Sequence, residues 1–328
     1  MILTYIVIFV LLFALELIYF KIADHYNIID KPNNRSSHTT ITLRGGGIIF
    51  YFGALIWWLH CDFTNPFFFI GLSVISIISF IDDIHSLTPK FRLSLQLLSI
   101  LLMVFQLLKD NSILENDNYL IITVIIIFSL FITTGAINVF NFMDGINGIT
   151  GGYSLIVLLS LIYPYFQIND KDVIQLLYIS IIAVIVFCFF NFRKKAKCFA
   201  GDVGSVSIAF ILFFLIGKLI FITKDFSWLT LVVVYGVDGV MTIFHRILLH
   251  ENLSQPHRKH AYQIMANELK IPHIIVSIIY MTIQTIINII YSIYPTYLSM
   301  IMCILILCLS YLFFMKKYYH LHSNKNNK

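Results

Sequence analysis

The sequence predicts an all-α, polytopic membrane protein, a helical bundle of about eleven transmembrane helices. Hydrophobic residues make up 59% of the chain and charged residues only 12%, a balance outside the range of soluble domains. Apolar runs of about 16–22 residues recur from end to end, and a helix of about 20 residues crosses the ~30 Å hydrocarbon core of a bilayer. No long linker or low-complexity tract divides the chain, so we expect residues 1–328 to form a single integral-membrane domain.

The expected helices follow the apolar runs in chain order. They lie near residues 2–20, 47–60, 66–81, 93–108, 119–140, 152–167, 172–191, 205–223, 228–244, 273–294 and 297–315. The first run has no basic segment before it and no small-residue cleavage site after it, which favours a spanning helix over a signal peptide. Glu16 interrupts this run about one turn before Lys21, and we expect it to reach the membrane interface.

Lysine and arginine are distributed unevenly between the two sides of the predicted bundle. If the helix count is right, alternate connections share one side, and these hold 18 of the 22 Lys and Arg residues. They are residues 21–46, 82–92, 141–151, 192–204, 245–272 and 316–328. Because positive residues mark the cytoplasmic side, we expect the N-terminus outside and the C-terminus in the cytoplasm. The segments with unusual chemistry lie on this same side.

A polar stretch, Asn138-Val-Phe-Asn141-Phe-Met-Asp144-Gly-Ile-Asn147, follows the fifth apolar run directly. Its first two amides and Asp144 recur every three residues, so on a continuing helix they spread across one face. A carboxylate and three amides are too polar to face lipid, and they must face water, protein or a ligand. The alternative is a solvated loop that ends the helix.

Three acidic residues stand at predicted helix ends. Asp82 and Asp83 follow the third apolar run, and Asp202 lies between glycines at the start of the eighth. Carboxylates are hard oxygen donors, the type that Mg²⁺ or Mn²⁺ takes alongside substrate phosphates. The alternatives are a solvated turn for the pair and a helix N-cap for Asp202.

Cationic and glycine-rich segments supply groups that suit phosphates. Arg44 precedes three glycines that open a helix, where free N–H groups favour anions; a flexible hinge is the alternative. In the fifth of these connections His257, Arg258 and His260 can bind phosphate or transfer protons, unless they are incidental residues of a surface loop. Asp238, inside the ninth expected helix, is a site candidate because placing an acidic side chain inside a membrane costs free energy and is typical of functional sites.

Taken in order, these segments resemble the motif series of the polyprenyl-phosphate N-acetylhexosamine-1-phosphate transferases (glycosyltransferase family 4). The resemblance covers about residues 27–265. The series reads Arg44-Gly-Gly-Gly, Asp82-Asp83, Asn138-x-x-Asn141-x-x-Asp144-Gly-x-x-Gly148, Gly201-Asp202-x-Gly-Ser205 and His257-Arg-x-His260-x-Tyr-Gln. The chain departs from the family pattern where Asn147 replaces an acid, because an amide can hydrogen-bond but supplies no charge.

The resemblance implies an enzyme that transfers an N-acetylhexosamine 1-phosphate from a UDP-sugar to polyprenyl (undecaprenyl) phosphate and releases UMP. The chain looks more like the undecaprenyl-phosphate GlcNAc-1-phosphate transferase branch, which starts O-antigen, capsule or common-antigen synthesis. The phospho-MurNAc-pentapeptide transferases are the alternative branch; they carry consecutive histidines where this chain has His257-Arg258-Lys259-His260. The implied location is the bacterial cytoplasmic (inner) membrane, with the active site on its cytoplasmic face.

The resemblance also implies roles for single residues. Catalytic roles fall to Asp82, Asp83, Asp202, His257 and His260, and substrate-binding roles to Arg44, Asn138, Asp144, Asn147 and Arg258. The implied cofactor is Mg²⁺, or Mn²⁺ in its place, with Asp202 and Asn141 as ligands. The implied partners are the UDP-N-acetyl sugar, the polyprenyl phosphate and the bilayer, with no nucleic acid and with a homodimer left open.

Two rival functions remain at this point. An ion-coupled transporter would also have about eleven helices, interrupted backbone and intramembrane acids. Transporters, however, tend to show internal repeats and to place binding acids near the bilayer midplane. The sequence shows no such repeat, and its polar residues gather on one side. A non-catalytic lipid-binding membrane protein is the third option.

Overall fold

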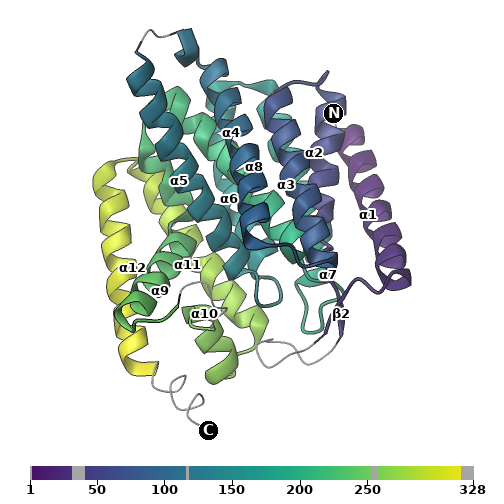
Figure 1. Ribbon diagram of the computed structural model, residues 1–328, viewed down its shortest axis with the longest axis vertical. Coiled ribbons are helices and arrows are strands. Elements are labelled where there is room, and N and C mark those ends of the chain that lie inside the picture. The colour runs from purple at the N-terminus through teal and green to yellow at the C-terminus, as the bar shows by residue number, and fades with distance from the viewer. Residues whose placement is uncertain (1, 32–40, 116–117, 253–257, 319–328) are drawn as a thin grey trace.

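The computed structural model describes residues 2–31, 41–115, 118–252 and 258–318 (Figure 1). Helices make up about four fifths of this part of the chain, and two strands of two residues pair antiparallel. The elements are α1 (Ile2–His25), β1 (Ile29–Asp30), β2 (Thr42–Leu43), α2 (Ile48–His60), α3 (Pro66–Ile84), α4 (Pro89–Asp110), η1 (Ile113–Glu115), α5 (Tyr119–Met143), α6 (Ile149–Ile168), α7 (Lys171–Asn191), α8 (Gly201–Thr223), η2 (Phe226–Val232), α9 (Val233–Leu248), α10 (Ala261–Gln263), η3 (Ile264–Glu268), α11 (His273–Ile293) and α12 (Tyr297–Tyr318).

This architecture confirms the predicted all-α polytopic class. Within the described residues, ten helical segments are long and apolar enough to cross a membrane, and α2 adds a shorter apolar helix. With 13 residues, α2 is about 20 Å long, less than the thickness of the hydrocarbon core. The segment Phe226–Leu248 is broken, because the 3₁₀ turn η2 leads into α9.

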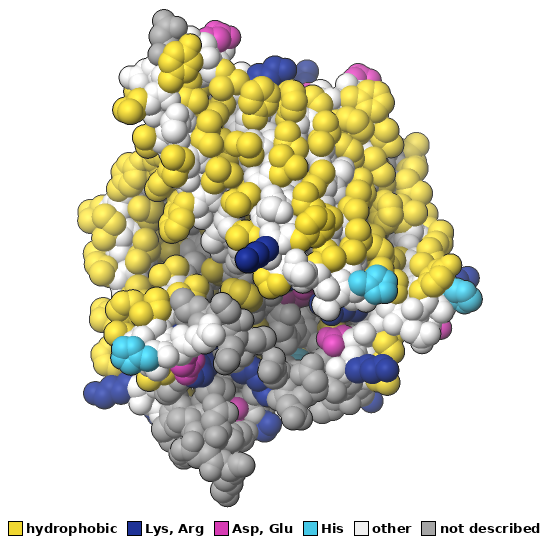
Figure 2. Space-filling model, viewed as in Figure 1, with side chains coloured by type: hydrophobic (Ala, Val, Ile, Leu, Met, Phe, Trp, Pro, Cys, Tyr) yellow, Lys and Arg dark blue, Asp and Glu magenta, His cyan; other side chains and the backbone are white. Residues whose placement is uncertain are grey.

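Helix α8 lies at the centre of the bundle and carries the core. Of its 23 residues 17 are buried, and it packs against α2, α3, α4, α5 and α6. A helix that is apolar all round is expected in such a position. Helices α1, α5 and α12 are peripheral and leave many large apolar side chains exposed. Figure 2 shows the resulting hydrophobic belt over one face, which is the surface that a bilayer covers.

The break between η2 and α9 is stabilised by Gln284 of α11. Its side-chain Oε1 accepts hydrogen bonds from the backbone N–H of Val234 at 3.1 Å and from the Tyr153 hydroxyl at 2.6 Å. Its Nε2 donates to the carbonyl of Thr230 at 3.1 Å. Backbone groups left unpaired in lipid are costly, so one buried glutamine makes the interruption tolerable.

One end of the bundle holds the described polar connections 26–31, 41–47, 85–88, 144–148, 192–200, 249–252 and 258–272, and we call it the site end. Here β2 is fixed to the segment that precedes α8: the N–H of Phe199 donates to the carbonyl of Leu43 at 2.8 Å. The N–H of Gly46 donates in turn to the carbonyl of Phe199 at 2.9 Å. Two connections that are far apart in the sequence are therefore joined beside the start of α8. The membrane side that the site end faces stays a prediction.

Candidate active site

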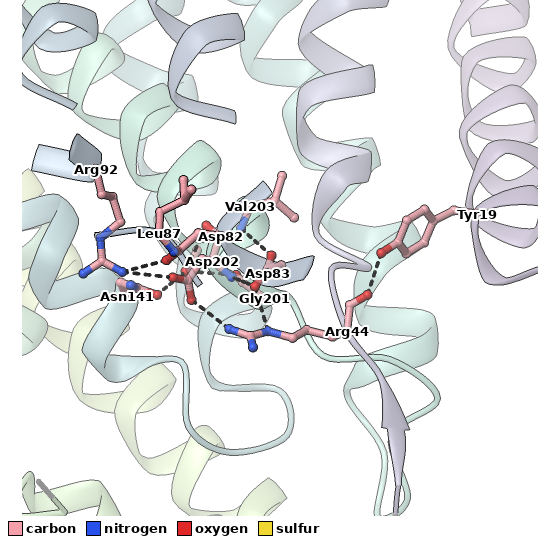
Figure 3. A network of polar contacts seen from close by, with 11 residues as sticks. Tyr19, Arg44, Asp82, Asp83, Leu87, Arg92, Asn141, Gly201, Asp202 and Val203 are labelled. Carbon is pink, nitrogen blue, oxygen red and sulfur yellow. Dashed lines mark hydrogen bonds and ion pairs between the residues drawn. The ribbon is translucent and has the colours of Figure 1, made fainter. Parts of the chain in front are cut away.

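Three carboxylates converge at the site end, where α3 ends and α8 begins (Figure 3). Asp83 in the last turn of α3 accepts hydrogen bonds from the N–H groups of Asp202 at 2.9 Å and Val203 at 3.0 Å. It therefore acts as the N-terminal cap of α8, supplied by another helix. Gly201 makes the approach possible: its φ is +71°, and a Cβ there would lie 2.6 Å from Oδ2 of Asp83.

Two arginines bridge the three carboxylates. The Nε of Arg44 lies 2.7 Å from Oδ1 of Asp83, and its Nη2 lies 3.4 Å from Oδ1 of Asp202. Arg92, from the first turn of α4, places Nη1 2.8 Å from Oδ2 of Asp82 and 3.5 Å from Oδ2 of Asp202. Both arginine contacts to Asp202 are long, so this carboxylate keeps the most capacity for a further ligand.

The side chain of Arg44 is held in place through its backbone. The hydroxyl of Tyr19 on α1 donates to the carbonyl of Arg44 at 2.5 Å. Two and three residues further on, the N–H groups of Gly46 and Gly47 donate to the carbonyls of Phe199 and Ala200. Burial opposes the charge of Arg44, but the carboxylates of Asp83 and Asp202 outweigh it, and the net effect raises the pKa of Arg44.

The amides of α5 approach the same cluster from the side. The Oδ1 of Asn141 accepts a hydrogen bond from the Ser205 hydroxyl at 2.9 Å, and Asn138 donates to the Thr134 carbonyl at 2.8 Å. Asn138, Asn141 and Asp202 line one small pocket between α3, α4, α5 and α8. The rest of its lining is Ile75, Ile78, Ser79, Arg92, Gln96 and Val206.

The turn after α5 places Asp144 and Asn147 differently. Asp144 accepts a hydrogen bond from the Thr150 hydroxyl at 2.7 Å. Burial raises the pKa of Asp144 to about 7, and the nearby charge of Asp202 acts in the same direction. Asn147 is buried, and its Nδ2 donates to the carbonyls of Arg193 at 2.9 Å and Lys194 at 3.3 Å. An aspartate could not donate these bonds, so the amide found here holds the turn against the α7–α8 connection.

The fifth connection forms a second polar cluster around Asp238 of α9. Asp238 accepts hydrogen bonds from the Tyr280 hydroxyl at 2.5 Å and the Ala261 N–H at 3.1 Å, and its Oδ1 lies 3.3 Å from Nδ1 of His260. The side chain of His260 is only 2% exposed. The structure therefore places His260 on the α9 acid and not against the carboxylates of α3 and α8. Tyr262 links the two regions by donating to the carbonyl of Phe142 at 2.8 Å.

The expected site residues fall into three groups. Asp82, Asp83, Asp202, Arg44 and Asn141 come together in one cluster, with Asn138 beside it. A second group, Asp144, Asn147 and His260, lies in neighbouring connections with hydrogen bonds of its own. The third consists of Arg258, which lies in the segment before α10, and His257, which lies outside the described residues.

The sequence matches a known family over the part of the chain that carries this cluster. Residues 66–220 match the family model described as glycosyl transferase family 4. The match covers 155 of the 328 residues and includes Asp82, Asp83, Asn141 and Asp202. Together with the names of the curated relatives, this match identifies the chain as a transferase and does not support an ion-coupled transporter.

Curated relatives of this chain come from several bacteria. A protein of Bacillus subtilis, named as a probable undecaprenyl-phosphate N-acetylglucosaminyl 1-phosphate transferase, is 24% identical over 74% of this chain and 70% of its own length. An Escherichia coli K12 protein, an undecaprenyl-phosphate alpha-N-acetylglucosaminyl 1-phosphate transferase, is 25% identical over 75% of this chain and 71% of its own. A Yersinia pestis protein of the same name is 26% identical over 62% of this chain and 59% of its own length.

Two residues lie elsewhere than the sequence suggested. Arg92 was not expected in the site, because arginines at helix ends commonly serve only to fix topology. Its place in the first turn of the helix that follows Asp82 is the signal that could have found it. The expectation that Glu16 reaches the membrane interface is wrong: Glu16 is fully buried, with Oε1 3.7 Å from Sγ of Cys198.

The oxygen donors of the cluster fit a hard divalent cation. They comprise the carboxylates of Asp82, Asp83 and Asp202 and the amide oxygen of Asn141. Among the described residues, no group of three or more His, Cys, Asp or Glu side chains is arranged as a ready metal cage. Mg²⁺ is commonly held by one or two carboxylates together with waters and substrate phosphates, so a full cage is not required.

Proposed function

We propose that this transferase moves an N-acetylhexosamine 1-phosphate from a UDP-sugar to polyprenyl phosphate, on the cytoplasmic face of a bacterial inner membrane. A phosphate oxygen of the lipid attacks the β-phosphorus of the UDP-sugar and forms the new diphosphate bond. The bond between the β-phosphorus and the bridging oxygen breaks, and UMP leaves with that oxygen. The names of the relatives support both the lipid acceptor and the sugar 1-phosphate group.

The observation that carries the proposal is the meeting of three carboxylates, two arginines and an α5 amide at one end of the bundle. Transfer between two phosphate groups requires little covalent chemistry from a protein; positioning and charge neutralisation dominate. Arg44 and Arg92 approach the cluster from opposite sides, as Figure 3 shows, and each can bind phosphate oxygens through several N–H groups. A site of this kind suits a diphosphate and a phosphate monoester held together.

An apolar cavity provides a place for the polyprenyl chain. It lies between α4, α5 and α8, and its lining includes Met103, Leu107, Ile125, Phe128, Phe213 and Phe221. The polar pocket beside Asp202 uses the same three helices together with α3. The acceptor would therefore place its phosphate at the site end and its hydrocarbon chain along the seam between these helices.

Each residue of the cluster has its own role in the proposed reaction. Asp202, with the longest arginine contacts, would hold the divalent cation, with Asn141 as its amide partner. Bound there, the cation would offset negative charge on the phosphate oxygens. Asp83 fixes the start of α8 and with it the position of Asp202. Asp82, held by Arg92 and the N–H of Leu87, would orient the acceptor phosphate.

The names of the relatives and the fifth connection also bear on the donor sugar and the pathway. The relatives are named for N-acetylglucosamine, and we propose an N-acetylhexosamine of this type as the first sugar of a cell-surface polysaccharide. The segment His257-Arg258-Lys259-His260 lacks the consecutive histidines of the phospho-MurNAc-pentapeptide branch. A panel of UDP-sugars assayed with one polyprenyl phosphate would identify the donor.

The reaction is tested by UMP release from purified membranes given a UDP-N-acetyl sugar, undecaprenyl phosphate and Mg²⁺. Wild-type membranes should release UMP, and chelation of divalent cations should stop the release. Asp202→Ala should lower the rate at least a thousandfold, whereas Asp225→Ala, in the connection at the opposite end, should not change it. Release at the wild-type rate from Asp202→Ala would overturn the metal assignment, and no release from the wild type would overturn the reaction.

A further inference from the structure

A glutamine that no step above uses lies buried beside the carboxylate cluster. Gln96 on α4 is only 7% exposed, and its Nε2 is buried without a hydrogen-bond partner among the residues that the structure describes. Nearly all buried polar side chains in folded proteins are hydrogen-bonded, so an unpaired amide needs an explanation. A ligand that supplies the missing acceptor is one such explanation.

The surroundings of Gln96 indicate what this ligand carries. Gln96 lines the pocket that Arg92, Asn138 and Asp202 also line. It follows Arg92 by four residues on α4, so the two side chains lie on the same face of the helix. An amide N–H and a guanidinium together offer donors only, which suits an anionic oxygen such as that of a phosphate.

The direction of the pocket indicates where the rest of the ligand lies. One and two turns beyond Gln96 on the same face of α4 are Ile100 and Met103, and Met103 lines the apolar cavity. On α5, Asn138 lines the polar pocket and Thr133 the apolar cavity. Five residues of helix separate them, about 7.5 Å along the axis. Both spaces are lined by α4, α5 and α8, so a ligand with an anionic head and a long apolar tail would place its head in the first and its tail along the second.

We propose that Gln96 is an acceptor-binding residue: its Nε2 donates to a non-bridging oxygen of the polyprenyl phosphate, next to Arg92. This inference rests on the proposed function, since it names the part of the site that takes the lipid phosphate. The unpaired amide then has its partner only in the lipid-bound enzyme. Binding to the phosphate of the lipid should depend on Gln96, and binding to its hydrocarbon chain should not.

The experiment measures binding of undecaprenyl phosphate and of undecaprenol to the purified full-length chain, without UDP-sugar, for wild type and Gln96→Met. Methionine keeps the size of the side chain and removes the donor. Gln106→Met is the matched control, because Gln106 is a second buried glutamine of α4 that already bonds to the N–H of Phe67 and to Asp110. We expect Gln96→Met to weaken phosphate binding about tenfold, with undecaprenol binding unchanged. Gln106→Met should instead lower the thermal unfolding midpoint and leave the preference for phosphate intact.

Three results would overturn the proposal. In the first, Gln96→Met keeps the wild-type preference for undecaprenyl phosphate over undecaprenol. In the second, Gln96→Met loses as much affinity for undecaprenol as for undecaprenyl phosphate. In the third, the wild type already binds the two lipids with equal affinity. In the UMP-release assay the KM for undecaprenyl phosphate should rise about tenfold in Gln96→Met, while the KM for the UDP-sugar stays within twofold. A rise confined to the UDP-sugar would assign Gln96 to the donor and would also contradict the proposal. Since lipid binding is measured without turnover, failure of the proposed reaction is recognised separately by absent UMP release from the wild type.

Discussion

At the scale of single residues, Asp83 and Asp202 illustrate how adjacent carboxylates acquire different tasks. Asp83 accepts two backbone N–H bonds and a short contact from Arg44, which leaves its oxygens nearly saturated. Asp202 has two arginine contacts of 3.4 and 3.5 Å, and its carboxylate borders the pocket beside α5. The first is therefore a residue that positions the second, and only the second is arranged to meet a cation or a phosphate.

Changing each aspartate to asparagine should have different effects on stability and activity. Asp83→Asn keeps one acceptor oxygen but loses the second bond to the start of α8 and the charge opposite Arg44. We expect it to lose about 2 kcal/mol of stability as well as activity. Asp202→Asn should lose activity with little change in stability, because it also relieves repulsion between the carboxylates. Thermal unfolding in detergent together with UMP release tests the difference, and equal thermal midpoints for the two variants would contradict it.

Arg92 should be required as an arginine and not merely as a cation. One Nη1 group faces Asp82 and Asp202 together, and lysine presents a single point charge on a flexible stem. We expect Arg92→Lys to lower kcat/KM for UMP release about 10- to 100-fold, with the thermal midpoint within about 2 °C of wild type, since Arg92 is partly exposed. Lys90→Arg, on the same turn of α4, is the control and should leave the rate unchanged. Wild-type kinetics for Arg92→Lys would exclude a specific role.

At the scale of helices, the site depends on a close backbone approach between the start of α2 and α8. A Cβ added at Gly47 would lie 2.3 Å from Cα of Gly204, which is backbone and cannot rotate away. The same turn carries Arg44, and it is bonded to the segment before α8. The distance between these two helices therefore sets the distance from Arg44 to Asp202.

Substitution of either glycine should push the two helices apart. We expect Gly204→Ala to cost about 2–3 kcal/mol of stability and most of the activity. Gly236→Ala in α9 is the matched control, because a Cβ there meets nothing within 4 Å. That substitution should be neutral or should stabilise the chain by up to about 1 kcal/mol, since alanine is the better helix former. Thermal unfolding of the two alanine variants decides the matter, and a stable, active Gly204→Ala enzyme would refute the role of this crossing.

The sequence was a good guide to the helices and a weaker one to their contacts. Apolar length alone locates the spanning helices, because lipid requires every backbone group to be paired within a helix. The crossing at Gly47 and Gly204 leaves no such signature, since a glycine triplet also suits a flexible hinge. Arg92 was missed for a related reason: a single arginine at a helix end looks the same whether it fixes topology or binds phosphate. The hydrogen bonds of Asn147 likewise depend on which loop packs against it.

At the scale of the whole molecule, the two ends of the bundle use charge differently. The site end holds carboxylates and arginines around a pocket, whereas the other end holds Lys218 between Asp110 at 3.6 Å and Asp170 at 3.0 Å. This ion triad joins the ends of α4 and α7 to α8 and touches no part of the site. We expect Lys218→Met to lower stability by about 1–3 kcal/mol and to leave the KM values unchanged. Thermal unfolding and UMP release measure both effects; a changed KM would show coupling between the ends.

The grouping of the site residues was also predictable from the sequence, because it follows from counting helices. One predicted span separates the N-terminus from the first of the connections that together hold 18 of the 22 Lys and Arg residues. Every second connection then returns to the same end, and the structure places Arg44, Asp82, Asn141 and Asp202 together there. The side of the membrane that this end faces stays a prediction from the charges, and the positive-inside rule predicts the cytoplasm.

This orientation predicts opposite labelling of two engineered cysteines. In a variant whose five native cysteines are replaced, Ser112→Cys lies between α4 and α5 at the far end, and Lys195→Cys lies between α7 and α8 at the site end. A membrane-impermeant maleimide should label Ser112→Cys in intact cells and Lys195→Cys only after the inner membrane is opened. Both variants must still release UMP, which shows that the bundle is intact. The reverse pattern would place the carboxylates on the outer face and would contradict the predicted orientation.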